Sequence, residues 1–172
     1  LYEHEVTGSY LREDFHKNPQ HYLCKFLPYA AQTDILLNGV YWEEGVPPLF
    51  HRSDIKKDDF IIQTIADVSD DKNGSVPINI ASQSIEDPVY GVSRSTLQKT
   101  QPYEPGSIDI MAVSNLPNEL PRDASRYFGE QLIKYVLDDL LTGGSPVIER
   151  ATIARNGRLQ KPFEYLKDYV IN

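Results

Sequence analysis

The sequence predicts an α/β fold in which helices cover a parallel β-sheet, and two observations lead to that prediction. Short apolar runs with polar flanks recur along the chain, which is the pattern of strands buried on both faces of a parallel sheet. Segments with helical spacing of apolar residues alternate with these runs, as they do in proteins built from strand–helix–strand units. With 172 residues, the chain is long enough for one domain or slightly more and can bury a real core.

The first half of the chain holds three predicted strands and two predicted helices. The strands are the opening run 1–6 and the apolar runs 34–40 and 60–68. Asn18 followed by Pro19 resembles a helix cap with proline at the first helical position, which predicts a helix over residues 18–31. The double proline at 47–48 enforces a loop, and a short helix is expected near residues 53–57.

The second half begins with a strand over residues 108–113, which follows 34–40 and 60–68 as the third apolar run. The chain then continues into a long amphipathic helix over about 122–141. The apolar residues of that helix recur at helical spacing: Phe128, Leu132, Ile133, Val136, Leu137 and Leu140. Gly143 and Gly144 are expected to end it. A last strand over 147–153 and a C-terminal helix over about 162–170 complete the prediction.

Composition and charge exclude several classes of function. The formal net charge of −8 argues against a nucleic-acid surface, because phosphate binding depends on clustered lysine and arginine. No run of about 18 apolar residues is present, so no membrane span is predicted. The single cysteine, Cys24, cannot form an internal disulfide and fits a reducing compartment, which predicts a cytoplasmic location.

Familiar catalytic and metal-binding motifs are absent. The chain contains neither the glycine-rich turn G-x-G-x-x-G nor a P-loop. The segment Gly91-Val-Ser-Arg-Ser95 lacks the final glycine of a nucleophile elbow, and the four histidines show no metal-ligand spacing. The sequence therefore predicts neither a serine hydrolase nor a metal site.

Three strand ends carry the candidate site. They are Gly39-Val40-Tyr41, the run from Asp67 to Asp71, and Val113-Ser114-Asn115-Leu116. In a parallel sheet the carboxyl ends lie at one edge, where open α/β sheets bind their ligands, so all three would line one crevice. Ordinary turn chemistry explains the Asp, Asn and Gly residues of each segment equally well, so both interpretations stay open here.

The same segments carry a resemblance to a known family. ILLNGVYWEEGVPPLF resembles a strand and loop of the lysine-ketoglutarate reductase and saccharopine dehydrogenase (lysine-forming) family, within the alanine dehydrogenase and transhydrogenase superfamily. IADVSDDKNGSV is similar to the family segment D-(I/V)-S-x-D-x-x-G-S, and SQSIEDPVY to the segment that follows it. AVSNLPNELPRDASRYFGEQL and the tail ERATIARNGRLQKPFEYLKDYV resemble the family's D-N-L-P-x-x-L-P block and closing element. The resemblance covers nearly the whole chain, in order.

The resemblance implies a role for each segment. Asp71 matches an aspartate that lies beside the nicotinamide and takes part in catalysis in alanine dehydrogenases, whereas Asp67 and Asp70 are expected to cap the turn or face solvent. The implied cofactor is NAD or NADP, and the implied substrates are lysine, 2-oxoglutarate and saccharopine. The residues expected to contact the cofactor are Gly39, Val40, Tyr41, Val68, Ser69, Val113, Ser114, Asn115 and Leu116.

The resemblance also implies a fold and a domain division. The chain would form part of a Rossmann-like doubly wound parallel sheet with helices on both faces, lacking the first βαβ unit with the glycine-rich turn. Residues 1–116 would be the C-terminal part of the dinucleotide-binding domain, and 117–172 would return toward the substrate domain. Because the only methionine is Met111, we expect a fragment of a longer oxidoreductase, inactive without the N-terminal part of the same protein. Its oligomeric state is not predicted, and a homo-oligomer stays open.

Two rival hypotheses remain. An alanine dehydrogenase fragment would keep the superfamily and change the substrate to pyruvate and ammonia, but the closing N-G-R-L element and the tryptophan of VYWEE count against it. A non-catalytic module would keep the fold without the chemistry, and the absence of a glycine-rich turn from the sequence agrees with that hypothesis.

Overall fold

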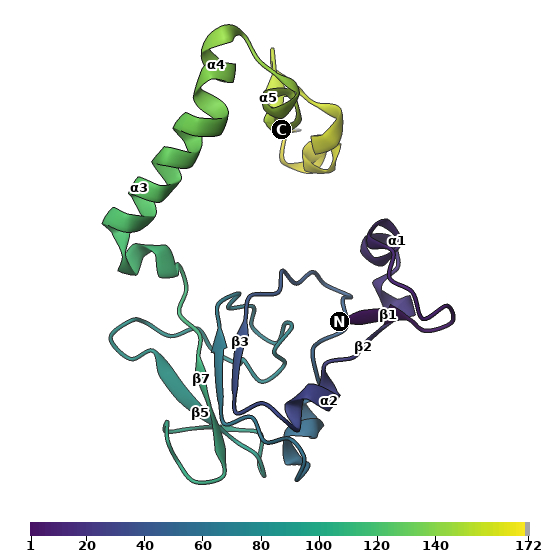
Figure 1. Ribbon diagram of the computed structural model, residues 1–172, viewed down its shortest axis with the longest axis vertical. Coiled ribbons are helices and arrows are strands. Elements are labelled where there is room, and N and C mark those ends of the chain that lie inside the picture. The colour runs from purple at the N-terminus through teal and green to yellow at the C-terminus, as the bar shows by residue number, and fades with distance from the viewer. Residues whose placement is uncertain (171–172) are drawn as a thin grey trace. The chain divides into compact units, whose positions relative to one another are not determined.

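A computed structural model describes residues 1–170 of the chain, which form two compact units, Leu1–Leu116 and the segment that begins at Pro117 (Figure 1). The first unit contains a five-stranded mixed sheet, and the second is built mainly of helices. The predicted α/β class is therefore confirmed. No helix among residues 1–170 is both long and apolar enough to cross a membrane.

The central sheet has the strand order β3-β4-β7-β5-β6. Strands β3 (Ile35–Asn38), β4 (Thr64–Asp67) and β7 (Ser107–Met111) run parallel, as predicted from their apolar runs. Strand β5 (Val89–Ser93) is antiparallel to β7, and β6 (Lys99–Thr100) is antiparallel to β5. The predicted parallel sheet is thus present in β3, β4 and β7, whereas the edge beyond β7 is an antiparallel hairpin that was not predicted.

The β5–β6 hairpin depends on a glycine in its first strand. A Cβ atom on Gly91 would lie 2.3 Å from Thr100 Oγ1 and 2.4 Å from the Gln101 carbonyl oxygen, so a side chain here would push β6 away. The turn between the strands places Leu97 in the left-handed region, at φ 61°. A glycine inside a short strand weakens the apolar pattern, which explains why the sequence did not predict this hairpin.

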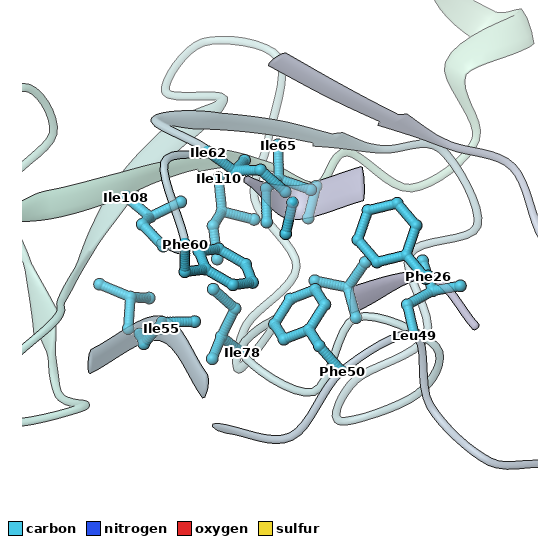
Figure 2. Packing of buried hydrophobic residues seen from close by; sticks show 14 of the residues in the cluster. Phe26, Leu49, Phe50, Ile55, Phe60, Ile62, Ile65, Ile78, Ile108 and Ile110 are labelled. Atoms are coloured by element: carbon cyan, nitrogen blue, oxygen red, sulfur yellow. The ribbon is translucent and has the colours of Figure 1, made fainter. Parts of the chain in front are cut away.

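One apolar core holds the first unit together. The alternating burial along β4 and β7 directs Ile65, Ile108 and Ile110 into it, and all three side chains are fully buried. Figure 2 shows these strand residues packed against aromatic and aliphatic side chains from the surrounding loops and from η2. Those side chains are Phe26, Leu49, Phe50, Ile55, Phe60, Ile62 and Ile78.

The N-terminal part of the first unit differs from its prediction. Its elements are β1 (Tyr2–His4), α1 (Arg12–Lys17), η1 (Pro19–His21), β2 (Tyr22–Cys24) and α2 (Leu27–Ala30). The predicted helix over 18–31 is wrong, because Tyr22–Cys24 pairs with β1 as a strand. The cause is tertiary, since the Tyr22 ring is buried against the Phe15 ring, with centroids 5.1 Å apart. The short helix near 53–57 is present as the 3₁₀ helix η2 (Arg52–Lys56).

The second unit is led by the predicted long helix. It consists of α3 (Pro121–Leu132), a π-helical segment η4 (Ile133–Leu137) and α4 (Asp138–Thr142), and it ends at Gly143 with φ 101°. The predicted strand over 147–153 is wrong. Helix α5 (Pro146–Ala151) forms there, because the Ser145 hydroxyl caps it by accepting from the Ile148 N–H and Pro146 suits the first helical position.

Smaller elements complete the chain. They are η3 (Leu116–Glu119), the hairpin of β8 (Ala154–Arg155) and β9 (Arg158–Leu159), and the 3₁₀ segment η5 (Lys161–Tyr169). The last of these overlaps the predicted C-terminal helix but departs from helical geometry at Phe163.

Candidate functional site

The three predicted strand ends meet at one edge of the sheet. Strands β3, β4 and β7 are parallel neighbours, with Asn38 opposite Asp67 and Ala66 opposite Met111. The chain leaves each of them on the same side. The structure therefore brings together the loops that the sequence singled out, at the edge where parallel sheets hold ligands.

Two of these loops enclose a groove of about 340 Å³. It is lined by Gly39, Val40, Tyr41, Trp42, Val68, Ser69 and Asp71. All but Trp42 were predicted. Trp42 is fixed there because its indole N–H donates to the Val46 carbonyl oxygen at 3.0 Å. The groove thus has apolar walls, two aromatic side chains and a single carboxylate, a composition typical of small-molecule sites.

The third predicted loop does not line this groove. Val113 is buried, while Ser114 and Asn115 are exposed. A hydrogen bond connects it to the second loop, because Ser114 Oγ donates to Asp70 Oδ2 at 2.6 Å.

The side chain at the centre of the edge is Asp67, which is fully buried. Its Oδ1 accepts from Asn38 Nδ2 at 2.7 Å and from Ser69 Oγ at 2.8 Å, and its Oδ2 accepts from Asn79 Nδ2 at 2.8 Å. Of the two expectations for Asp67, that it caps the turn or that it faces solvent, the second is wrong because the side chain is buried. This carboxylate joins β3, the end of β4 and the segment around Asn79.

A second layer of hydrogen bonds fixes the partners of Asp67. The Tyr90 hydroxyl of β5 donates to Asn79 Oδ1 at 3.0 Å and accepts from the Ile80 N–H at 2.9 Å. Burial raises the pKa of Tyr90, so the hydroxyl keeps its proton and can donate. On the other side, Asn38 Nδ2 lies 2.9 Å from the hydroxyl of buried Ser75.

Four residues of this network were not predicted from the sequence: Asn38, Ser75, Asn79 and Tyr90. The signal for Asn38 and Asn79 was an asparagine at the end of one apolar run, ILLN, and inside another, VPINI. A buried amide needs hydrogen-bond partners, so such a position can point to a polar network. Nothing in the sequence could pair these residues with Asp67.

The loop after β4 turns tightly to reach the groove. Asp70 and Asn73 both adopt left-handed backbone conformations, at φ 51° and 55°, which Asp and Asn tolerate better than other side chains. Gly74 N–H donates to the Asp71 carbonyl oxygen at 2.9 Å. A Cβ atom on Gly74 would lie 2.5 Å from Asp71 Cβ, so only glycine lets the chain pass this close.

Asp71 differs from its two neighbouring aspartates. Asp67 and Asp70 both accept hydrogen bonds from side chains, whereas the Asp71 carboxylate accepts none from the described residues. Burial, and then the charges of Asp67 and Asp70, raise the pKa of Asp71. A half-exposed carboxylate with free acceptor positions, at the wall of a groove, can receive a hydrogen bond or a positive charge from a ligand.

A larger groove, of about 730 Å³, lies at the amino ends of β4 and β7. Its charged wall includes Arg94, which already donates to the carbonyl oxygens of Ile55, Phe60 and Ile62 and so secures the loop between η2 and β4. Because this arginine has a structural task, we assign the candidate site to the smaller groove at the carboxyl edge.

The fold and this groove define an α/β protein with a candidate ligand site at the carboxyl edge of its parallel strands. The chain is similar to the mitochondrial alpha-aminoadipic semialdehyde synthase of Rattus norvegicus, with 29% identity over 95% of this chain and 20% of the relative. The corresponding protein of Arabidopsis thaliana is 27% identical over 96% of this chain and 16% of the relative. No protein-family model matches the chain.

A second kind of relative carries a narrower name. Saccharopine dehydrogenase [NAD(+), L-lysine-forming] of Yarrowia lipolytica is 29% identical over 70% of this chain and 31% of the relative. These similarities confirm the resemblance to the lysine-ketoglutarate reductase and saccharopine dehydrogenase family. The chain spans about a fifth of the length of the rat relative. The cytoplasmic location stays a prediction, since that relative is named mitochondrial.

Replacing Asp67 by alanine tests the buried network. We expect Asp67→Ala to lower the free energy of unfolding by about 3 kcal/mol, because it leaves the amides of Asn38 and Asn79 buried without their acceptor. Urea denaturation followed by circular dichroism measures the change. Asp59→Ala, which removes an exposed carboxylate, is the control and should change little. Equal stability of the two variants would contradict the assigned network.

Replacing Asp71 by asparagine tests the electrostatics of the groove. Because the folded carboxyl holds its proton more tightly than an unfolded one, its ionised form costs stability at neutral pH. We expect Asp71→Asn to unfold at a higher temperature than the wild type at neutral pH. The difference should shrink as pH falls and vanish below the ordinary pKa of 3.8. Asp59→Asn makes the same change in charge at an exposed position, and it should give no such gain.

Proposed function

We propose that the chain supplies the nicotinamide-binding side of an NAD(P)-dependent amino-acid dehydrogenase. The proposed reaction is the reduction of the imine of lysine and 2-oxoglutarate to saccharopine, or its reverse. The single observation that carries the proposal is the groove between the loops after β3 and β4, whose wall includes Asp71, a carboxylate that accepts no hydrogen bond from the described residues. The relatives named saccharopine dehydrogenase support the choice of substrate.

The residues of the groove suit a flat heteroaromatic ring with a carboxamide. Val40 and Val68 offer apolar surface, and Gly39 leaves open space where a side chain would stand. Backbone groups of these loops can bind a carboxamide or ribose, and Ser69 Oγ, whose proton is donated to Asp67, can accept one further hydrogen bond. The cofactor, NAD or NADP, supplies or accepts the hydride when bound.

The chain's own residues would orient the reactants. Asp71 would fix the substrate nitrogen or stabilise positive charge near the reacting carbon, since it has free acceptor positions and two anionic neighbours. Tyr41 and Trp42 would cover the groove and exclude water. Among its lining residues Asp71 is the one acidic or basic group, so we propose that a proton donor and acceptor come from outside this groove.

The proposal extends to the domains. The unit Leu1–Leu116 would be the C-terminal part of a Rossmann-like dinucleotide-binding domain, and residues 117–172 would lead back to the substrate domain. The glycine-rich turn of such a domain is absent from this sequence, so it would come from another part of a longer protein. This segment alone should then be inactive.

The test is the oxidation of NADH and NADPH by the full-length protein. We expect activity with lysine plus 2-oxoglutarate, and none with pyruvate plus ammonia. Activity with only the second pair would move the protein to alanine dehydrogenase. Inactivity with both would leave a non-catalytic module.

A substitution tests the role of Asp71 in that reaction. We expect Asp71→Asn to lower kcat by about 100-fold with the fold intact, because the charge that stabilises the reacting centre is removed. Asp59→Asn should keep wild-type kcat. Wild-type turnover by Asp71→Asn would remove Asp71 from the proposed mechanism.

A further inference from the structure

Asp70 connects two segments that flank the end of β7. Its Oδ2 accepts from Ser114 Oγ at 2.6 Å and from Ser82 Oγ at 2.7 Å. The segment that carries Ser82 is also bonded to the chain just after β7, since the Gln83 N–H donates to the Ala112 carbonyl oxygen at 2.7 Å. One carboxylate oxygen therefore joins the loop after β4 to both segments.

The backbone at both ends of the Asp70–Ser114 contact is unusual. Asp70 has φ 51°, and Asn115, which follows Ser114, has φ 57°. Left-handed conformations of residues other than glycine cost free energy and persist where the surroundings hold them. Such positions gather at ligand sites, and the Asp70–Ser114 hydrogen bond lies between two of them.

The Asp70–Ser114 hydrogen bond also connects the wall of the groove with the loop after β7, which does not line the groove. Asp70 directly precedes Asp71, whose carboxylate lies in the groove wall. Ser114 directly precedes Asn115, whose exposed amide can donate and accept hydrogen bonds. Without the Asp70–Ser114 hydrogen bond, no side-chain hydrogen bond in the described structure joins the Ser114–Asn115 segment to the loop after β4.

We propose that Asp70 is a positioning residue. Through Ser114 it holds the Ser114–Asn115 segment beside the groove, so that a ligand held at Asp71 also meets this segment. The inference rests on the proposed function, because the ligand is taken to be a nicotinamide dinucleotide. We assign Asp70 no contact with the ligand: its Oδ2 accepts from the two serine hydroxyls, and its Oδ1 accepts from Asn79 Nδ2 at 3.5 Å.

Two substitutions of Asp70 distinguish the loss of its hydrogen-bond acceptor from a change in its backbone conformation. Asp70→Gly removes the acceptor but keeps the left-handed conformation accessible. We expect it to raise the Kd of the full-length protein for NADH about tenfold, measured by fluorescence titration, because a charge-assisted hydrogen bond is lost. Asp70→Asn retains an acceptor oxygen and tolerates the same φ, so it should recover most of the affinity.

The serine partners provide a matched pair of controls. Ser114→Ala and Ser82→Ala each remove one hydroxyl donor to the same oxygen of Asp70. If Asp70 acts through Ser114, adding Asp70→Gly to Ser114→Ala should change the Kd by less than twofold, whereas the tenfold effect should persist in Ser82→Ala. Equal effects in both backgrounds would overturn the proposal.

A second readout needs no ligand. In the ligand-free protein, Asp70→Gly and Ser114→Ala should both speed amide hydrogen exchange at residues 114–116, and Ser82→Ala should not. If the wild type binds NADH and Asp70→Gly alters neither Kd nor exchange, the positioning role is wrong and the proposed function stands. If the wild type binds neither NADH nor NADPH, the proposed function fails, and the inference fails with it.

Discussion

The buried carboxylate of Asp67 is the constraint on which the candidate site depends. It is a fully buried charge, and its nearest polar partners are the side chains of Asn38, Ser69 and Asn79. A buried carboxylate without a cation is stable only if donors surround it, so the loops that supply these donors must all approach the same point. The Tyr90 hydroxyl of β5 donates to Asn79, so β5 is also held at this point. Strand ends that could splay apart are thereby held as one edge.

Three aspartates within five residues have three different tasks. Asp67 is enclosed by donors, Asp70 joins two serines across the edge, and Asp71 is left free in the wall of the groove. Burial raises the pKa of Asp71, and the charges of Asp67 and Asp70 raise it further. An arrangement that lowers stability at neutral pH is expected where a carboxylate serves a ligand rather than the fold.

The sequence predicted the parts of the molecule that depend on local pattern. The apolar runs of β3, β4 and β7 and the apolar stripe of the long helix are read directly from residue spacing, and the convergence of three strand ends follows from their parallel pairing. The β5–β6 hairpin and the strand at Tyr22 were missed, because a close approach at Gly91 and an aromatic cluster around Phe15 decide them. The role of Asp67 was missed because its partner Asn79 lies beyond a turn whose path the sequence does not show.

We propose that a nicotinamide dinucleotide binds at the carboxyl edge of the sheet, and the larger groove at the opposite edge is the alternative site. Hydrogen exchange of the full-length protein with and without NADH tests this choice most directly. We expect NADH to protect residues 39–42, 68–71 and 113–116, and to leave residues 103–109 unchanged. Protection confined to residues 103–109, with none at the three strand ends, would contradict the account.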